Sequence, residues 1–265
     1  MGQAGLLSGL ANKTGALGAR AGRVLDLLLP PLCLACGAHL SGDGYGRGAL
    51  CAGCWASLDF IEEPLCAVTG LPFAFDPGPD VVSAVAVAHP PAYAHARAAM
   101  RYSAVSGRLI QKLKYGDRTE LARAFAGWMA RAGAALIEAA DFLAPVPLHP
   151  SRLRQRRFNQ SAELARAIGR VTGARVMPEL LVRVRATPPQ VGLSASARQR
   201  NVAGAFALPA DKVDRVRGRT ILLVDDVLTT GATVEACAGV LLRGGAARVD
   251  VLTLARVVPG DEVHI

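Results

Sequence analysis

One stretch, ILLVDDVLTTGATVEA at residues 221–236, constrains the fold of this chain more than any other. Ile221 to Val224 form a continuous apolar run, as a central parallel strand covered on both faces requires. Two acids follow, then a Thr-Thr-Gly turn, and then a helix predicted from Thr233 to Arg243. This order predicts an open α/β sheet, in which ligands bind beyond the carboxyl ends of the strands.

The turn at residues 229–233 suits a phosphate group. It places backbone N–H groups at a helix N-terminus, where the helix dipole favours negative charge. Gly231 permits close approach, and the three threonines of the turn can add hydroxyl donors. Asp225 and Asp226 would repel a phosphate, but they can accept hydrogen bonds from sugar hydroxyls. The alternative is a polar loop with a threonine N-cap, in which two buried acids without donors would be costly.

The rest of the chain predicts strands that alternate with helices, and therefore a parallel sheet with flanking helices. We expect strands at 81–88, 142–147, 220–224 and 248–255, and helices at 103–113, 120–140, 159–171 and 233–243. The sequence FDPGPD at 75–80 is a cluster of turn formers and the clearest break. We expect a lead-in over 1–24, a cysteine module over 25–75, a main domain over 81–265, and no internal repeat.

Four of the six cysteines form two close pairs, Cys33-x-x-Cys36 and Cys51-x-x-Cys54, separated by fourteen residues. Two such pairs can supply four thiolates to one tetrahedral Zn²⁺. Two unrelated thiol pairs or a redox pair are the alternatives. With all four positions as ligands no position is open for chemistry, so the zinc would be structural and would contribute to folding.

The formal net charge of +9 favours polyanionic partners: nucleic acid, phosphorylated metabolites or an anionic membrane surface. Between Pro145 and Arg200 there are eleven arginines against two glutamates. No stretch is apolar over the roughly 20 residues that a bilayer span requires, and the N-terminus makes a poor signal peptide. We therefore expect no membrane span and a cytoplasmic location. The motif GxxxxGK[ST] is absent, which argues against an ATP motor.

The motif VDDVLTTGAT resembles the site for 5-phosphoribosyl-1-pyrophosphate (PRPP) in type I phosphoribosyltransferases. Further motifs narrow the resemblance to the ComF family, which combines an N-terminal zinc ribbon with a phosphoribosyltransferase domain and is linked to natural competence. They are Lys112-Leu113-Lys114-Tyr115-Gly116-Asp117, Pro145-Val146-Pro147-Leu148-His149, Arg157-Phe158-Asn159-Gln160-Ser161, Arg185-x-Thr187-x-x-Gln190-x-x-Leu193 and Arg198-x-x-Asn201. The resemblance covers nearly all of residues 25–255.

This resemblance implies a type I phosphoribosyltransferase fold and a glycosyltransferase that binds PRPP together with Mg²⁺. Asp225 and Asp226, the candidate catalytic residues, would hold the ribose 2′ and 3′ hydroxyls. The stretch 183–200 resembles the mobile hood loop that closes over PRPP. The other implied PRPP ligands are the 5′-phosphate turn Thr229, Thr230, Gly231, Ala232 and Thr233, the pyrophosphate donors Leu148 and His149, and the hood arginines Arg183, Arg185 and Arg198.

Related proteins often show a second cysteine pair near Cys66, but here Thr69 stands at the partner position. We therefore expect no second complete zinc site, and we expect Cys66 and Cys237 to be packed core residues. Three functions stay open: an enzyme that transfers phosphoribose to an unidentified acceptor, a non-catalytic PRPP sensor, and a DNA-handling protein. The third would act on single-stranded DNA, with a separate competence helicase supplying the force.

Overall fold

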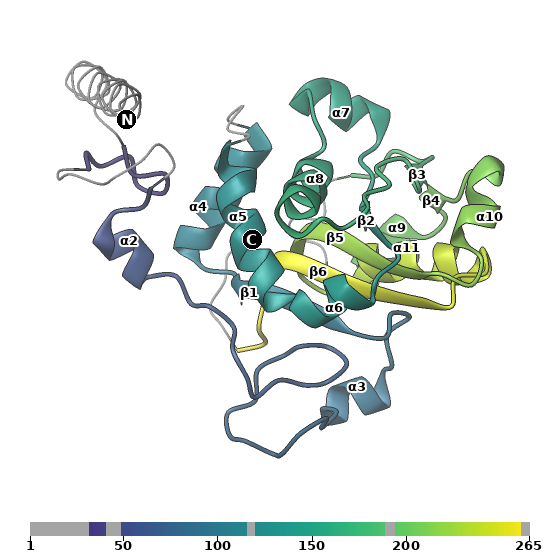
Figure 1. The fold of residues 1–265 in the computed structure, drawn as a ribbon, viewed down its shortest axis with the longest axis horizontal. Helices are drawn as coiled ribbons and strands as arrows, with labels where there is room; N and C mark the ends of the chain where they lie inside the picture. The colour runs from purple at the N-terminus through teal and green to yellow at the C-terminus, as the bar shows by residue number, and fades with distance from the viewer. Residues whose placement is uncertain (1–31, 41–48, 116–119, 189–193, 261–265) are drawn as a thin grey trace, which may run out of the picture. The chain divides into compact units, whose positions relative to one another are not determined.

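The computed structural model describes residues 32–40, 49–115, 120–188 and 194–260. The chain divides into two units, Met1–Ala56 and Ser57–Ile265 (Figure 1). In the first unit the described residues form two short stretches that carry the cysteines, and the second stretch ends in helix α2 (Ala52–Ala56). The domain boundaries expected from the sequence stay predictions.

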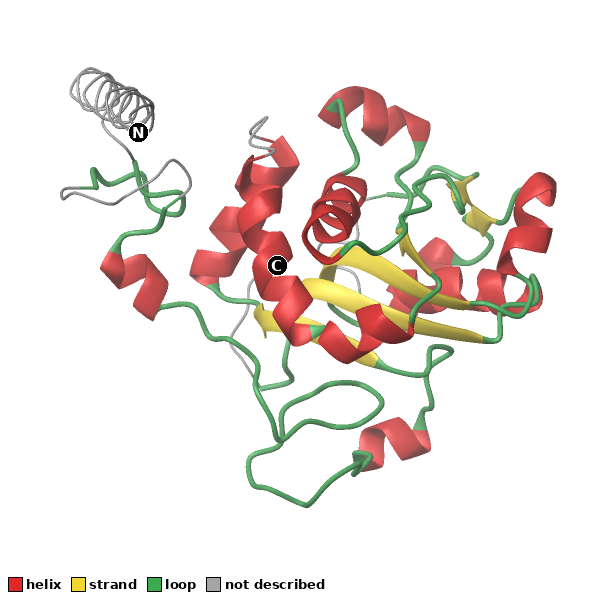
Figure 2. Cartoon of the chain, in the orientation of Figure 1, coloured by secondary structure: helices red, strands yellow, loops and turns green. Residues whose placement is uncertain are grey.

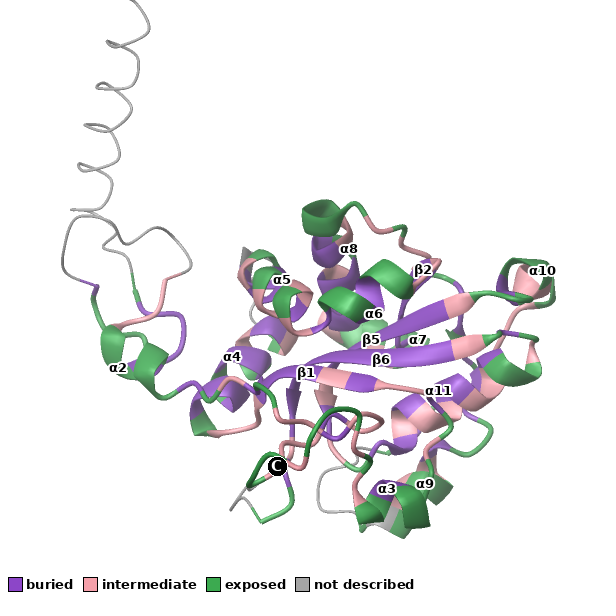
Figure 3. Ribbon diagram, turned by 60° about the horizontal axis from the view of Figure 1, so that its bottom comes forward, coloured by how far each residue is buried: buried purple, intermediate pink, exposed green. Residues whose placement is uncertain are grey.

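A parallel sheet organises the described part of the second unit, with strand order β1-β6-β5-β2 (Figure 2). Its strands are β1 (Ala96–Arg101), β2 (Phe142–Pro145), β5 (Thr220–Leu228) and β6 (Arg248–Arg256). The central strands β5 and β6 are buried along nearly their whole length (Figure 3), as expected for strands covered on both faces. The α/β fold class with a parallel sheet is confirmed.

Helices cover both faces of this sheet. α5 (Glu120–Ala132), α6 (Ala134–Ala139) and α8 (Gln160–Thr172) lie on one face, and α9 (Ala195–Val202) and α11 (Ala232–Arg243) lie on the other (Figures 1 and 3). The remaining elements are α3 (Ala84–Ala88), α4 (Ala104–Tyr115), α7 (Pro150–Arg156), the 3-10 turn η1 (Ala210–Lys212), α10 (Val213–Val216) and the antiparallel pair β3 (Val182–Arg183) and β4 (Phe206–Ala207). No helix among the described residues is long and apolar enough to cross a membrane.

The strand predicted at 81–88 is wrong, because this segment contains the short helix α3. Ser83 caps the helix by accepting a hydrogen bond from the backbone N–H of Ala86, and Val85 and Val87 are each 67 % exposed. The sheet begins instead with β1, whose sequence ARAAMR has no β-branched residue. An alternation of valine and alanine therefore predicted a strand in the wrong place.

The helix predicted over 120–140 is two helices that meet at Gly133. A Cβ atom on Gly133 would lie 2.7 Å from Cδ1 of Leu252 on β6. Glycine therefore allows the chain to pack closely against the sheet at the point where the helix breaks. The other predicted helices agree with α4, α8 and α11 to within about two residues.

Candidate functional site

The two acids lie at the point where β5 loses one neighbour and keeps the other. β2 pairs with β5 only as far as Pro145, which lies opposite Val224. β6 continues to pair with β5 from Asp225, opposite Thr253, as far as Leu228. Strand β5 is therefore longer than predicted, and the acids belong to its last part rather than to the loop. The end of the β2 ladder exposes this part of the strand to a cavity.

Asp225 is buried and held by two donors. Ser161 Oγ, at the start of α8, donates a hydrogen bond of 2.8 Å to Asp225 Oδ1, and the backbone N–H of Asp226 donates one of 2.9 Å to the same oxygen. Burial, followed by the negative charge of Asp226, raises the pKa of Asp225 to about 7. The carboxyl group is therefore poised between its neutral and charged forms near neutral pH.

Asp226 is buried beside Asp225 and is paired with a lysine. Its Oδ2 lies 3.0 Å from Nζ of Lys114 on α4, which forms an ion pair with it. Burial lowers the pKa of Lys114, but the charge of Asp226, the hydrogen bond to Asp226 and the charge of Asp225 together outweigh burial, so this pKa lies above its usual value.

Asp225 makes the stability of the unligated chain depend on pH. Its pKa of about 7 in the folded chain lies above the ordinary value of 3.8, so its contribution to stability is complete below about pH 4 and is lost as the pH rises from about 4 to 7. We expect Asp225→Asn to match the wild type near pH 3.5 and to be more stable by about a few kcal/mol near pH 8. Urea denaturation at both pH values measures this difference. The exposed Asp214→Asn should show no such change, and equal behaviour of the two variants would contradict the assignment.

The turn after β5 is not a threonine-capped loop. Gly231 occupies the cap position of α11 with φ at 84°, and no side chain caps the helix. Thr229 and Thr233 line the cavity, whereas Thr230 is exposed. Gly231 and Ala232 are buried and contribute main-chain groups to the turn. The uncapped N-terminus of α11 therefore lies beside the cavity, where its dipole favours an anion.

The cavity has a volume of about 480 Å³ and gathers residues from five helices and from four strands or the loops that follow them. Seven of the residues predicted to bind PRPP line it: Leu148, Arg183, Arg198, Asp225, Asp226, Thr229 and Thr233. His149 does not, because its ring accepts a hydrogen bond from the N–H of Ser151 and caps α7. Arg185 is exposed and donates to the carbonyls of Asn201 and Ala203 at 3.0 and 2.6 Å. Gln190 and Leu193, Gly116 and Asp117 lie outside the described residues.

Sequence reasoning missed several cavity residues as site residues: Lys114, Arg152, Arg156, Gln160 and Ser161. Lys114, Gln160 and Ser161 belong to motifs that carried the family resemblance, and the two arginines belong to the arginine-rich segment. Nothing local in the sequence shows that α4 and α7 face the end of β5. Tertiary structure alone brings these side chains together.

Several cations crowd around the cavity. Burial, and then the charge of Arg152, lowers the pKa of Arg183. Burial, and then the charge of Arg156, lowers the pKa of Arg152. The buried Nε of Arg183 has no hydrogen-bond partner in the described part of the chain, although its Nη2 donates to Thr187 Oγ1. Guanidinium groups held together in this way are stabilised by an anion that neutralises them.

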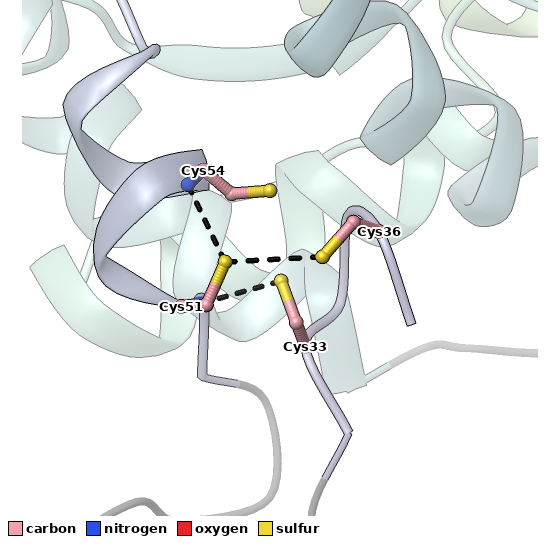
Figure 4. A group of neighbouring side chains, drawn as sticks. All are labelled: Cys33, Cys36, Cys51 and Cys54. Atoms are coloured by element: carbon pink, nitrogen blue, oxygen red, sulfur yellow. Dashed lines mark hydrogen bonds between the residues drawn. The ribbon is translucent and has the colours of Figure 1, made fainter. Parts of the chain in front are cut away.

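The four paired cysteines form a compact cluster in the first unit (Figure 4). Their sulfur atoms all lie within 4.8 Å of one another, and Sγ of Cys36 lies 3.8 Å from Sγ of Cys51. Tetrahedral zinc with Zn–S bonds of about 2.3 Å sets its sulfur atoms about 3.8 Å apart. Burial raises the pKa of Cys33, but hydrogen bonds from the backbone N–H groups of Cys36 and Cys51 lower it to about 6. The cluster fits one structural zinc ion.

Comparison with known proteins supports both parts of this description. The double zinc ribbon domain family matches residues 24–85, and the phosphoribosyl transferase domain family matches residues 172–262. The chain is 34 % identical over 236 residues to "DNA utilization protein YhgH" of Salmonella typhimurium. The aligned residues cover 87 % of this chain and 99 % of that protein. It is 34 % identical over 116 residues to "Competence protein F" of Haemophilus influenzae, covering 44 % and 50 % of the two chains.

Among solved structures, the chain is similar to one titled as the allosteric regulatory enzyme of purine biosynthesis. The identity is 19 % and the TM-score 0.37, over 54 % of this chain and 29 % of that one. A similarity of this size says nothing about function.

Proposed function

Because the chain belongs to the ComF family, with a zinc ribbon and a phosphoribosyltransferase domain, we propose that it binds PRPP at the end of β5 and transfers the phosphoribosyl group to an acceptor. The observation that carries the proposal is the pair of acids, Asp225 and Asp226, on the wall of a cavity rich in cations. Such a cavity suits a ligand that presents sugar hydroxyls at one point and phosphates around it.

Asp225 and Asp226 would bind the ribose hydroxyls. Asp226 would accept from one hydroxyl while it keeps its ion pair with Lys114, and Asp225 can accept from the second once it is ionised. Ser161 holds the Asp225 carboxyl in a fixed orientation, and Lys114 neutralises part of the charge of the pair. Fixed acids orient the sugar so that its anomeric carbon faces the acceptor, which lowers the entropic part of the barrier.

The two phosphate-bearing ends of PRPP would bind on either side of these acids. The 5′-phosphate fits the turn from Thr229 to Thr233, at the uncapped N-terminus of α11. The pyrophosphate fits the cavity wall that includes Leu148 and Arg183, where the crowded arginines supply positive charge. Magnesium bound with PRPP would neutralise part of the charge on the departing pyrophosphate. The cations of the cavity would act on the same charge.

Two of the three hood arginines, Arg183 and Arg185, allow a cavity residue to be compared with a neighbour that lies outside the cavity. We expect Arg183→Gln to weaken PRPP binding by about 10-fold or more, because a charge-assisted hydrogen bond contributes about 1.5–3 kcal/mol. Arg185→Gln should leave the affinity within about twofold, because Arg185 does not line the cavity. Titration calorimetry measures both affinities, and thermal unfolding checks that both variants fold. Equal losses for the two variants would contradict this placement of the pyrophosphate.

Release of pyrophosphate from PRPP, with and without added nucleobases, nucleosides and cell extract, tests the transfer step. A transferase releases pyrophosphate faster when its acceptor is present, by a factor that depends on acceptor concentration. A protein that binds PRPP and releases no pyrophosphate under any of these conditions would be a PRPP sensor, and the transferase proposal would fail.

Handling of single-stranded DNA is a second candidate, favoured by the names of the relatives and by the surface of α7. A hollow of about 280 Å³ beside the cavity is lined by Lys114, Tyr115, Gln155, Arg156 and Arg157. Arg156 lies 5.0 Å from the centre of the exposed Tyr115 ring. Basic groups beside an aromatic face suit a nucleic acid strand. Binding to a labelled oligonucleotide that does not weaken steeply with added salt would argue against this surface.

A further inference from the structure

A segment of the second unit repeats the geometry of the first cysteine turn. In the first unit, the N–H of Cys33 donates to the carbonyl of Ala38 at 2.8 Å, and the N–H of Gly37 donates back to Cys33 at 2.9 Å. In the second unit, the N–H of Cys66 donates to Leu71 at 2.8 Å, and the N–H of Gly70 donates back to Cys66 at 2.8 Å. Both glycines have positive φ, 76° for Gly37 and 64° for Gly70. Short antiparallel bridges, Leu32 to His39 and Leu65 to Pro72, close the two turns.

The second half of the ribbon is repeated as well. The N–H of Cys51 donates to Sγ of Cys33 at 3.3 Å, and the N–H of Cys54 donates to Sγ of Cys51 at 3.4 Å. The N–H of Ser83 donates to Sγ of Cys66 at 3.3 Å, and the N–H of Ala86 donates to Oγ of Ser83 at 3.4 Å. A short helix follows in each case, α2 and α3. The expectation of no internal repeat is therefore wrong: residues 65–88 form a second ribbon.

This correspondence identifies the four positions at which a second zinc ion would have its ligands. They are Cys66, Thr69, Ser83 and Ala86, in the places of Cys33, Cys36, Cys51 and Cys54. One thiol is present, one position has only a methyl group, and the two others carry hydroxyls, which are poor ligands for zinc. Both hydroxyl oxygens already accept hydrogen bonds, from the N–H groups of Leu71 and Ala86. The residues do not fit a zinc ion.

The second ribbon keeps its fold through contacts with β1, the outermost strand of the sheet. The N–H of Ala96 donates to the carbonyl of Val68 at 2.7 Å, and Arg97 Nη1 donates to the carbonyl of Ala67 at 3.1 Å. A Cβ atom on Gly70 would lie 2.2 Å from the carbonyl oxygen of Ala96, so the turn and the strand approach as closely as glycine allows.

The chain just before the second ribbon and the end of β6 add to these contacts. The N–H of Ile61 donates to Ala99 at 3.0 Å, and the N–H of Arg101 donates to Asp59 at 2.8 Å. Arg256, buried at the end of β6, donates to the carbonyl of Thr69. Hydrogen bonds to the sheet and to the Cys66 sulfur therefore hold the backbone of the second ribbon in place. In the first ribbon a metal ion would hold the equivalent backbone.

We infer that residues 65–88 form a metal-free ribbon that, together with the preceding residues 57–64, covers the outer edge of β1, and that the chain binds one zinc ion at Cys33, Cys36, Cys51 and Cys54. The two ribbons therefore differ in what stabilises them, although both belong to the region that matches the double zinc ribbon family. The first ribbon depends on metal for its fold, whereas the second depends on the phosphoribosyltransferase sheet.

Zinc content of the purified full-length chain tests this inference. We expect about one zinc ion per chain by elemental analysis, and about one again in Cys66→Ser. Cys36→Ser is the matched control, which removes a thiol from the first ribbon and should lower the zinc content of the folded chain towards zero. Two zinc ions per wild-type chain, or a loss of zinc in Cys66→Ser comparable to that in Cys36→Ser, would overturn the inference.

Restoring the missing ligands provides an independent test. The variant Thr69→Cys/Ser83→Cys/Ala86→Cys places thiols at the three positions that lack them and should bind a second zinc ion, giving about two per chain. Circular dichroism and thermal unfolding show whether this variant keeps the fold. A folded variant that still binds only one zinc ion would show that these positions are not equivalent to the ligand positions of the first ribbon.

Discussion

Replacing both acids at the end of β5, in the variant Asp225→Asn/Asp226→Asn, should reduce PRPP affinity by roughly 100-fold or more while the chain stays folded. Each carboxylate that binds a ribose hydroxyl contributes about 1.5–3 kcal/mol through a charge-assisted hydrogen bond, so losing two such bonds weakens binding by several kcal/mol. Asparagine keeps the shape of the side chain, so packing is nearly unchanged. Titration calorimetry with PRPP and Mg²⁺ measures the loss.

The single variant Asp225→Asn, in which Asp226 keeps its ion pair with Lys114, should unfold at a higher temperature than the unligated wild type above neutral pH. Burial and mutual repulsion make ionised Asp225 unfavourable, as its raised pKa indicates, and asparagine removes that cost. The matched control for the double variant is Asp211→Asn/Asp214→Asn, which removes the same charge from exposed positions and should alter neither property. Unchanged PRPP affinity in a folded double variant would refute the assignment of the acids.

Removing the zinc ion should unfold the first unit and leave the second intact. Structural zinc contributes about 10–16 kcal/mol of apparent binding free energy in small zinc-dependent modules, and the described part of this unit has few buried apolar residues to replace it. We expect Cys36→Ser/Cys54→Ser to lose zinc and to become sensitive to limited proteolysis before Ser57. The fragment that begins near Ser57 should resist proteolysis, because it contains its own sheet and core.

Cys237→Ala is the control for the zinc prediction. Cys237 is a buried thiol on α11 in the second unit, so this variant should retain zinc and the proteolysis pattern of the wild type. If the double cysteine variant still bound zinc, or resisted proteolysis as the wild type does, the cluster would not be a structural zinc site.

The part of the fold that local sequence could predict is the part in which signals follow one another along the chain. In β5 and α11, the apolar run, the two acids and the glycine turn are consecutive, and the structure places them as predicted apart from the longer strand. The cysteine pairs of the first ribbon are equally local. The acid and glycine motif of β5 and α11 and the paired cysteines are each typical of few kinds of site at these spacings.

The parts that sequence reasoning missed depend on backbone contacts or on distant segments. β1 has an alanine-rich sequence, and its place in the sheet follows from its pairing with β6. The second ribbon is held by backbone hydrogen bonds to Cys66, which leave no pattern of side chains. Lys114 and Arg156 come from α4 and α7 and approach the acids only in the folded chain. The sequence shows such residues but not what they face.

A crystal structure of the chain with PRPP and Mg²⁺ tests the central claim most directly. We expect the ribose hydroxyls within hydrogen-bond distance of Asp225 and Asp226, the 5′-phosphate against the main chain from Thr229 to Thr233, and the pyrophosphate beside Leu148 and Arg183. Density for PRPP at another place on the chain, or a cavity at the end of β5 that stays closed to it at saturating concentration, would contradict the account.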